Sequence, residues 1–409
     1  MKFIHYKNNS LFFENCSAYS LAKNNKTPFY CYSKAKIIKN FTNFSKIFSK
    51  ISPLICFAVK SNNNIFLLQE LKKLGAGADV VSAGELLRAL KAGINPKKIV
   101  FSGIGKTEDE LRIAIQKKIL LINIESESEA VLINNLSKKL SKKTSIGIRL
   151  NPNIDSNTHK KISTGRNQNK FGMLYKDCFQ LVRKIKNMKN LKLEGISVHI
   201  GSQILNVNPF RKTLLILNKL ISSAKINLKF IDLGGGMGIP YSQKQKELNL
   251  KKYANEVKKF IKNKKIKIIF EPGRFIIGNT SVLVSKIIYI KSSNSKKFII
   301  LDAGMNNLMR PALYNSMHEI IPIKKSNNRI KGNLEFVGPI CESSDRFLSK
   351  KKFSQIKEGD YVVFKNTGAY GMSMSSNYNL RPAIGEILVN GSKYKIIRKR
   401  QSLESLVNN

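Results

Sequence analysis

The chain has 409 residues, of which 42% are hydrophobic and 24% are charged, a composition that indicates a globular protein with room for two or more domains. No apolar run approaches the ~20 residues of a membrane span and the first residues do not form a signal peptide, so we expect a cytoplasmic protein without a membrane partner. The formal net charge of +46 favours a polyanionic partner, but the excess is carried by lysine, is spread over most of the chain and accompanies no nucleic-acid-binding motif. This predicts at most weak, salt-sensitive polyanion binding and no specific nucleic-acid partner.

The first two thirds of the chain have the pattern of a parallel α/β fold. Residues 28–32 predict a strand, and residues 34–50 predict the first helix. From residue 54 to about residue 275, apolar strand-like runs alternate with amphipathic helical stretches. There are eight such runs, at residues 54–60, 78–82, 98–102, 120–125, 145–151, 193–199, 228–234 and 266–271. Eight parallel strands close a (β/α)8 barrel.

After about residue 280 the pattern changes to short strands separated by turns. The predicted strands lie at residues 282–290, 297–301, 334–337, 361–365, 383–389 and 393–397. We therefore expect an α/β plus all-β protein. Residues 34–277 form the barrel, while residues 1–33 and 278–409 form a β-sandwich or β-barrel domain that the N-terminal strand completes.

Lys60 ends the first apolar run of the barrel, which reads as a strand buried on both faces. The C-terminal ends of barrel strands face one rim, where active sites are built. We expect an ammonium there to be desolvated, which favours the neutral amine that condenses with a carbonyl group. The alternative is that Lys60 only flanks the strand and points to water, and the segment taken alone favours that alternative.

Other strand ends carry further candidates for chemistry. Gly234, Gly235 and Gly236 allow backbone N–H groups to approach an anion such as a phosphate, although a tight turn has the same pattern. The segment Glu271-Pro272-Gly273-Arg274 places a carboxylate and a guanidinium close together. The carboxylate could face a pyridine nitrogen and the guanidinium a substrate carboxylate, or the two could form a structural ion pair. His199 is either a core histidine or a flat ring that stacks on a cofactor.

Together these segments resemble the fold-type III pyridoxal phosphate-dependent decarboxylases. The resemblance runs from about residue 27 to about residue 389, and the matching segments are residues 57–62, 78–86, 149–172, 199–203, 234–236, 271–274, 338–343 and 368–371. Within that family, the sequence is most similar to the members that decarboxylate meso-2,6-diaminopimelate to L-lysine, the last step of bacterial lysine biosynthesis. The resemblance implies a carboxy-lyase that uses pyridoxal 5'-phosphate. The five widely spaced cysteines, without a paired CxxC pattern, indicate no metal site.

The resemblance also assigns residues to the cofactor. It makes Lys60 the lysine that binds the cofactor covalently, Glu271 the partner of the pyridine nitrogen and His199 the residue that stacks on the ring. The remaining cofactor-binding residues that it implies are Asp79, Ser202, Gly234, Gly235, Gly236, Pro272, Gly273, Arg274 and Tyr370.

For the substrate, the resemblance implies a clamp on the distal carboxylate and one acidic residue for the distal ammonium. Arg274, Arg310 and Tyr314 resemble the clamp, Glu342 resembles the acid, and Tyr370 contacts both cofactor and substrate. Cys341 resembles the general acid that protonates the α-carbon, and thiols are mostly protonated at neutral pH. Because the family completes each site with this loop from the neighbouring subunit, the resemblance implies a homodimer with shared sites. The alternative for Cys341 is a buried filler residue.

Three other functions compete with this interpretation. A sister decarboxylase would act on ornithine, arginine or carboxynorspermidine, but the clamp would face the first two substrates with positive charge. A non-catalytic regulatory relative is expected to lack Lys60 or Cys341, and both are present. A polyanion-binding protein rests on charge alone.

Overall fold

The computed structural model describes residues 3–155, 164–165, 168–224 and 226–408. It separates into two compact units, one of residues 40–239 and 246–275 and the other of residues 1–39, 240–245 and 276–409. Parts of the matching segment 149–172, at residues 156–163 and 166–167, lie outside the described residues.

The first unit is a closed barrel of eight parallel strands, in the order β10-β11-β12-β5-β6-β7-β8-β9. All eight strands were predicted, each within three residues of its observed bounds. They are β5 (Leu54–Ala58), β6 (Gly77–Val80), β7 (Ile99–Phe101), β8 (Leu121–Ile124), β9 (Thr144–Leu150), β10 (Leu191–Val198), β11 (Phe230–Asp232) and β12 (Lys267–Phe270). The expected (β/α)8 barrel is confirmed.

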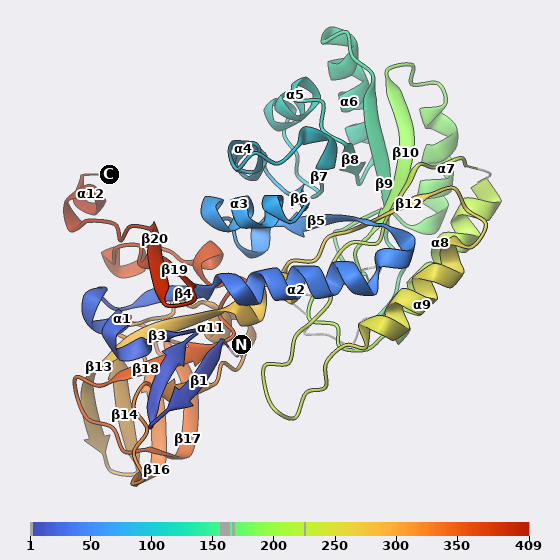
Figure 1. The fold of residues 1–409 in the computed structure, drawn as a ribbon. Coiled ribbons are helices and arrows are strands. Elements are labelled where there is room, and N and C mark those ends of the chain that lie inside the picture. Colours follow the sequence, from blue (N-terminus) through green and yellow to red (C-terminus); the bar gives the residue numbers. More distant parts are fainter. Residues whose placement is uncertain (1–2, 156–163, 166–167, 225, 409) are drawn as a thin grey trace. The chain divides into compact units, whose positions relative to one another are not determined.

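Helices cover the outside of the barrel (Figure 1). They are α3 (Ile65–Lys73), α4 (Ala83–Lys91), α5 (Glu108–Gln116), α6 (Glu127–Lys139), α7 (Tyr175–Ile185), α8 (Asn208–Ala224) and α9 (Leu250–Ile261). Several begin at a side-chain cap that satisfies a free backbone N–H of the first turn, such as Asn64 before α3, Ser82 before α4 and Ser126 before α6. The loops that these three caps end, after β5, β6 and β8, are short.

The barrel interior is apolar at one end and polar at the other. Leu54, Cys56, Val100, Leu121 and Ile269 form a fully enclosed cluster. Polar residues lie closer to the C-terminal ends of the same strands. Groups that can take part in a reaction are therefore found at that rim of the barrel.

The second unit is built on a nine-stranded sheet. Its main path runs β17-β16-β14-β13-β4-β19-β20, and β18 pairs with both β13 and β15. The strands are β4 (Phe29–Ser33), β13 (Ser281–Ser293), β14 (Lys296–Leu301), β15 (Ile320–Pro322), β16 (Arg329–Val337), β17 (Arg346–Ser354), β18 (Tyr361–Lys365), β19 (Gly385–Asn390) and β20 (Lys393–Arg398). Strand β4, which comes early in the chain, lies between β13 and β19 in this sheet.

Several smaller parts of this unit were not predicted, among them α1 (Ala18–Asn24). A three-stranded sheet is formed by β1 (Ile4–Lys7), β2 (Ser10–Phe13) and β3 (Cys16–Ser17). Two short helices, α11 (Arg310–Tyr314) and α12 (Leu403–Val407), and the strands β15 and β17 were also missed. Strand β17 reads Arg-Phe-Leu-Ser-Lys-Lys-Lys-Phe-Ser and lies at one end of the sheet path. It was missed because a lysine-rich edge strand lacks the apolar alternation that identifies a strand.

Helix α2 (Lys34–Ile47) spans the boundary between the two units. Within the described part of the chain, none of the helices has the length and apolarity needed to cross a membrane.

Candidate active site

A cavity of about 270 Å³ lies at the C-terminal ends of the barrel strands. Seven of the eight strands or the residues directly after them contribute to its wall. The lining residues are Lys60, Val81, Ser102, Gly103, Asn123, Arg149, Thr164, Phe171, Ser197, Val198, His199 and Glu271. Three of the residues proposed from the sequence, Lys60, His199 and Glu271, are therefore brought together in one cavity.

Lys60 lies in a single 3-10 turn (Val59–Ser61) rather than at the end of a strand. The strand stops at Ala58, whose carbonyl accepts a hydrogen bond from Ser61 Oγ at 2.7 Å, and this bond closes the turn. The Lys60 Nζ lies 2.7 Å from Asp79 Oδ2 on β6. The Lys60 side chain is 32% exposed while that of Asp79 is fully buried. The Lys60 side chain is therefore only partly buried and its amine has a carboxylate partner, which differs from the expected fully desolvated amine.

Glu271 follows β12 and belongs to a buried acidic group with Asp232. Burial raises the pKa of Glu271 well above its ordinary value, and the nearby charges of Asp232 and Asp79 raise it further. Burial likewise raises the pKa of Asp232 to about 6. The protonated carboxyl of Glu271 donates to Asp232, so the pair holds a proton under conditions in which exposed carboxyls have lost theirs.

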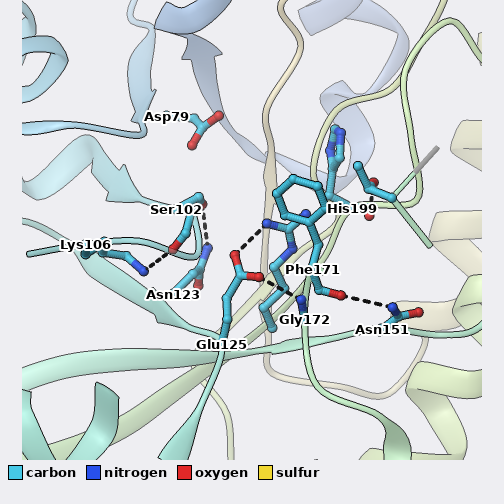
Figure 2. Close-up of polar contacts among 12 residues, drawn as sticks. Asp79, Ser102, Lys106, Asn123, Glu125, Asn151, Phe171, Gly172 and His199 are labelled. Carbon is cyan, nitrogen blue, oxygen red and sulfur yellow. Dashed lines mark hydrogen bonds and ion pairs between the residues drawn. The ribbon is translucent and has the colours of Figure 1, made fainter. Parts of the chain in front are cut away.

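Neutral side chains connect these acids to their neighbours. Ser102 Oγ donates to Glu271 Oε1 at 3.3 Å, and Asn123 Nδ2 donates to Ser102 Oγ at 3.2 Å and to Asp232 Oδ2 at 3.0 Å. Figure 2 shows Ser102 and Asn123 joined in this way. These hydrogen bonds fix the orientation of the carboxyl groups of Glu271 and Asp232.

The glycine loop after β11 leaves no room for side chains. Gly234 has a left-handed φ of +62°, and its N–H donates to Asp232 Oδ1 at 2.9 Å. A Cβ at Gly235 would lie 2.2 Å from the carbonyl oxygen of Glu271. Gly236 and Gly273 are similarly enclosed, and the carbonyl of Pro272 accepts from the N–H of Ala58. The predicted segments 234–236 and 271–274 therefore pack directly on each other.

Arg274 and Ser202 are also neighbours. Arg274 is 6% exposed, and its Nη2 donates to Ser202 Oγ at 3.0 Å. This contact joins the segment after β12 to the segment after β10.

His199, at the end of β10, has a neutral ring. Burial lowers the pKa of His199 well below its ordinary value, and the positive charges of Lys60 and Arg149 lower it further. The N–H of Gly235 donates to His199 Nδ1 at 3.2 Å, which makes Nδ1 an acceptor and leaves the proton on Nε2.

Arg149, to which no role was assigned from the sequence, also lines the cavity and forms an ion pair with Glu125. Arg149 Nη1 donates to Glu125 Oε1 at 2.7 Å, and Glu125 Oε2 accepts from the N–H of Gly172 at 2.6 Å. The guanidinium lies 5.1 Å from the ring centre of Phe171, whose carbonyl accepts from Asn151 Nδ2 at 2.9 Å. In Figure 2, Glu125 and Asn151 lie on either side of Phe171 and Gly172 and fix this segment. The signal in the sequence was an arginine within the apolar run of β9.

The second unit holds the other predicted residues. Arg310 is 4% exposed; its Nη1 donates to His318 Nε2 at 2.7 Å, its Nη2 donates to Ser316 Oγ at 3.3 Å, and its guanidinium lies 4.5 Å from the ring centre of Tyr241. Because Arg310 can only donate, the proton of His318 is on Nδ1, which donates to the carbonyl of Lys365. Arg310 is thus held rigidly.

Tyr314 and Tyr370 are half-buried, and Tyr370 has a left-handed φ of +57°. Cys341 and Glu342 are exposed, which removes the alternative of Cys341 as a buried filler. The other four cysteines are buried. Among the described residues, no group of three His, Cys, Asp or Glu side chains is arranged to hold a metal ion.

Comparisons with known proteins point to one family. Residues 34–278 match the family model of the pyridoxal-dependent decarboxylase, pyridoxal binding domain. The chain is 41% identical over 408 residues to the diaminopimelate decarboxylase of Aquifex aeolicus, covering 99% of this chain and 96% of that relative.

Solved structures agree with the sequence comparison. The diaminopimelate decarboxylase of Helicobacter pylori complexed with L-lysine has a TM-score of 0.91 and 39% identity, covering 95% of this chain and 98% of that one. The M. jannaschii enzyme in co-complex with L-lysine has a TM-score of 0.93 and 32% identity, covering 99% and 97%.

Proposed function

This chain belongs to the pyridoxal-dependent decarboxylase family, and from that premise we propose that it converts meso-2,6-diaminopimelate to L-lysine and carbon dioxide. The observation that carries the proposal is the single cavity at the barrel rim, where Lys60, His199 and Glu271 converge beside the glycine loop. Full-length relatives that share about 40% of the sequence supply the substrate class. The product is consistent with the lysine bound in two of the related structures.

Pyridoxal phosphate fits the residues of the cavity. Glu271 is a buried acid, and the charges that act on it most strongly are those of two other acids, Asp232 and Asp79, so a proton-bearing ring nitrogen offers it a cationic partner. The neutral ring of His199 can stack on an aromatic cofactor without repelling it. The loop around Gly234 and Gly235 excludes side chains, as a backbone cradle for a phosphate must.

When bound, the cofactor supplies an electron sink that accepts the bonding electrons released as carbon dioxide leaves. Lys60 would hold it through its amine, with Asp79 keeping that amine in place at 2.7 Å. Glu271 would pair with the ring nitrogen. The loop of Gly234, Gly235 and Gly236, which has no side chains, would adjoin the phosphate together with Ser202, while the N–H groups of Gly234 and Gly235 donate to Asp232 and His199. The remaining holding residues that we propose are Pro272, Gly273, Arg274 and Tyr370. We assign residues 34–277 as the cofactor-binding domain, a proposal supported by the family match.

For the substrate, we propose that Arg274, Arg310 and Tyr314 bind the carboxylate that is retained. Arg310 suits this role because three side chains hold its guanidinium fork in one orientation before substrate arrives. Glu342 would bind the far ammonium, since an exposed carboxylate selects a cationic end.

Cys341 would donate the proton that replaces the lost carboxylate. Its thiol is exposed, so the proton can be restored from solvent. We propose that Cys341 and Glu342 serve the cavity of a second copy of this chain in a homodimer with shared sites. We also propose a cytoplasmic location, since the reaction belongs to amino-acid biosynthesis.

The reaction is tested by measuring carbon dioxide and lysine release from meso-2,6-diaminopimelate, with ornithine and arginine offered as competing substrates. We expect release from diaminopimelate alone. Release from ornithine or arginine at a comparable kcat/KM would replace the proposed substrate.

The shared site is tested by mixing two inactive variants, Lys60→Ala and Cys341→Ala, under conditions that exchange subunits. A hybrid dimer contains one site with both residues intact, so an equal mixture should recover up to about a quarter of the wild-type activity. No recovery, with subunit exchange verified by a size or tag assay, would contradict shared sites.

A further inference from the structure

The loop of residues 338–345 presents Cys341 and Glu342 to solvent, and Asp345 closes it from below. The N–H of Ile340 donates to Asp345 Oδ2 at 2.7 Å, and the N–H of Gly338 donates to the Asp345 carbonyl at 3.0 Å. The N–H of Asp345 in turn donates to the carbonyl of Glu342 at 3.0 Å. These bonds shape the base of the loop but leave its two exposed side chains to be oriented by other contacts.

A second segment, residues 376–381, supplies those contacts. Tyr378 donates from its hydroxyl to Glu342 Oε1 at 2.6 Å. Asn379 Oδ1 accepts from the N–H of Cys341 at 3.0 Å. Arg381 Nη2 donates to the carbonyl of Pro339 at 3.4 Å. Three residues of this segment thus each hold a different residue of the loop.

The segment is itself held in an unusual conformation. Asn379 and Leu380 have left-handed φ angles of 54° and 51°, and leucine adopts this region at a cost. Asn377 Nδ2 donates to the carbonyl of Arg381 at 2.8 Å and to Gln401 Oε1 at 2.9 Å. The N–H of Ser376 donates to the carbonyl of Asn306 at 2.9 Å. The turn is therefore anchored at both ends.

We infer that Tyr378 and Asn379 are positioning residues for the proposed reaction, with separate tasks. Tyr378 engages one oxygen of Glu342 and leaves the other oxygen for the far ammonium of the substrate. Asn379 fixes the backbone that carries the Cys341 thiol. The inference rests on the proposed function, because both tasks are defined by the substrate and by the proton transfer.

The chemistry predicts different kinetic consequences for the two residues. Loss of the tyrosine hydroxyl leaves the carboxylate free to rotate, which weakens binding of the ammonium in ground state and transition state alike. Loss of the asparagine oxygen loosens the proton donor and leaves the groups that bind substrate unchanged. The first change acts on KM and the second on kcat.

The experiment uses Tyr378→Phe and Asn379→Gly in the full-length holoenzyme. Glycine adopts the left-handed φ without strain, so the second variant removes only the side-chain acceptor. We expect Tyr378→Phe to raise KM for diaminopimelate about fivefold with kcat nearly unchanged, and Asn379→Gly to lower kcat about fivefold with KM nearly unchanged. Tyr394→Phe, at another exposed tyrosine of the same unit, should alter neither constant.

A double-mutant cycle separates positioning from a general structural role. In a Glu342→Gln background the Tyr378→Phe change should lose most of its effect on KM, because the carboxylate it positions is absent. Full additivity, or wild-type constants for both single variants, would overturn the inference. Absence of decarboxylation by the wild-type enzyme would instead overturn the proposed function on which the inference rests.

Discussion

The barrel and the β unit hold their reactive side chains by opposite means. In the barrel, Glu271 at the cavity wall and its neighbour Asp232 are buried, and neighbouring charges and lost water change their proton affinity. In the β unit, Cys341 and Glu342 are exposed, and hydrogen bonds from a neighbouring turn orient them. Burial tunes acids and bases for a bound cofactor, whereas an exposed loop keeps its groups open to solvent protons and to a second surface.

The largest expected effect comes from the barrel, at Lys60. Lys60→Ala should abolish the absorbance of covalently held cofactor and lower decarboxylation by more than about 10⁴-fold, because no other residue is proposed to hold the cofactor carbonyl. The measurement is an absorbance spectrum of the purified protein together with carbon dioxide release.

Two further variants show why the Lys60→Ala enzyme loses activity. The alanine variant leaves the buried Asp79 without its cation, so Lys60→Arg, which keeps the positive charge, separates loss of the cofactor from loss of stability. Lys184→Ala removes a lysine from an exposed ion pair with Glu127 and should change nothing measurable. A Lys60→Arg enzyme that retains both the absorbance band and activity would refute the assigned role.

A smaller effect, of a different kind, is expected from the β unit. Cys341→Ala should lower kcat by about 10²-fold while the cofactor absorbance and KM stay close to those of the wild type, because only the proton donor is removed. Ser343→Ala, on the same exposed loop, is the control. Loss of the cofactor band in Cys341→Ala would break the comparison, since it would give the β loop a role in holding the cofactor.

The contrast between buried barrel strands and exposed loops also explains which features could be predicted from the sequence. Apolar runs of the right length identified all eight barrel strands, because a strand buried on both faces has few polar residues. Lys60, His199 and Glu271 could be proposed because each follows such a run, and the closed barrel brings them to one rim.

The polar contacts between strands could not be predicted in this way. Asp232 and Asn123 lie 109 residues apart, and Arg149 is on β9 while Glu125 directly follows β8, so their pairing depends on strand register in the closed barrel. The bond between Tyr378 and Glu342 joins two loops through a turn in which Leu380 has a left-handed φ, and a leucine gives no local signal for that conformation.

The smallest expected effect is a pH dependence of stability in the cofactor-free protein, and it tests whether burial tunes the barrel acids. Burial, together with the charge of Asp79, raises the pKa of Asp232 to about 6, above the value near ~3.9 of an unfolded chain. Between these values the native state binds more protons than the unfolded state. The stabilisation from this group is therefore complete below the unfolded value and is lost as the pH rises through about 6.

Asp232→Asn removes this contribution, together with the Asp232 charge that raises the pKa of Glu271 further. The new amide can still accept from the N–H of Gly234, and Asn123 can rotate its amide to pair with it, since Asn123 Oδ1 makes no hydrogen bond within the described chain. His199 contributes in the opposite direction, because its lowered pKa makes stability rise with pH, but that contribution is common to both proteins and cancels in their difference. Denaturant unfolding from pH 4 to pH 7 should show the wild type losing on the order of 1–3 kcal/mol more than Asp232→Asn. If the free energies of unfolding of the two proteins changed in parallel with pH, water would reach these acids and burial would not set their pKa values. The distinction drawn between the barrel and the exposed loop would then fail.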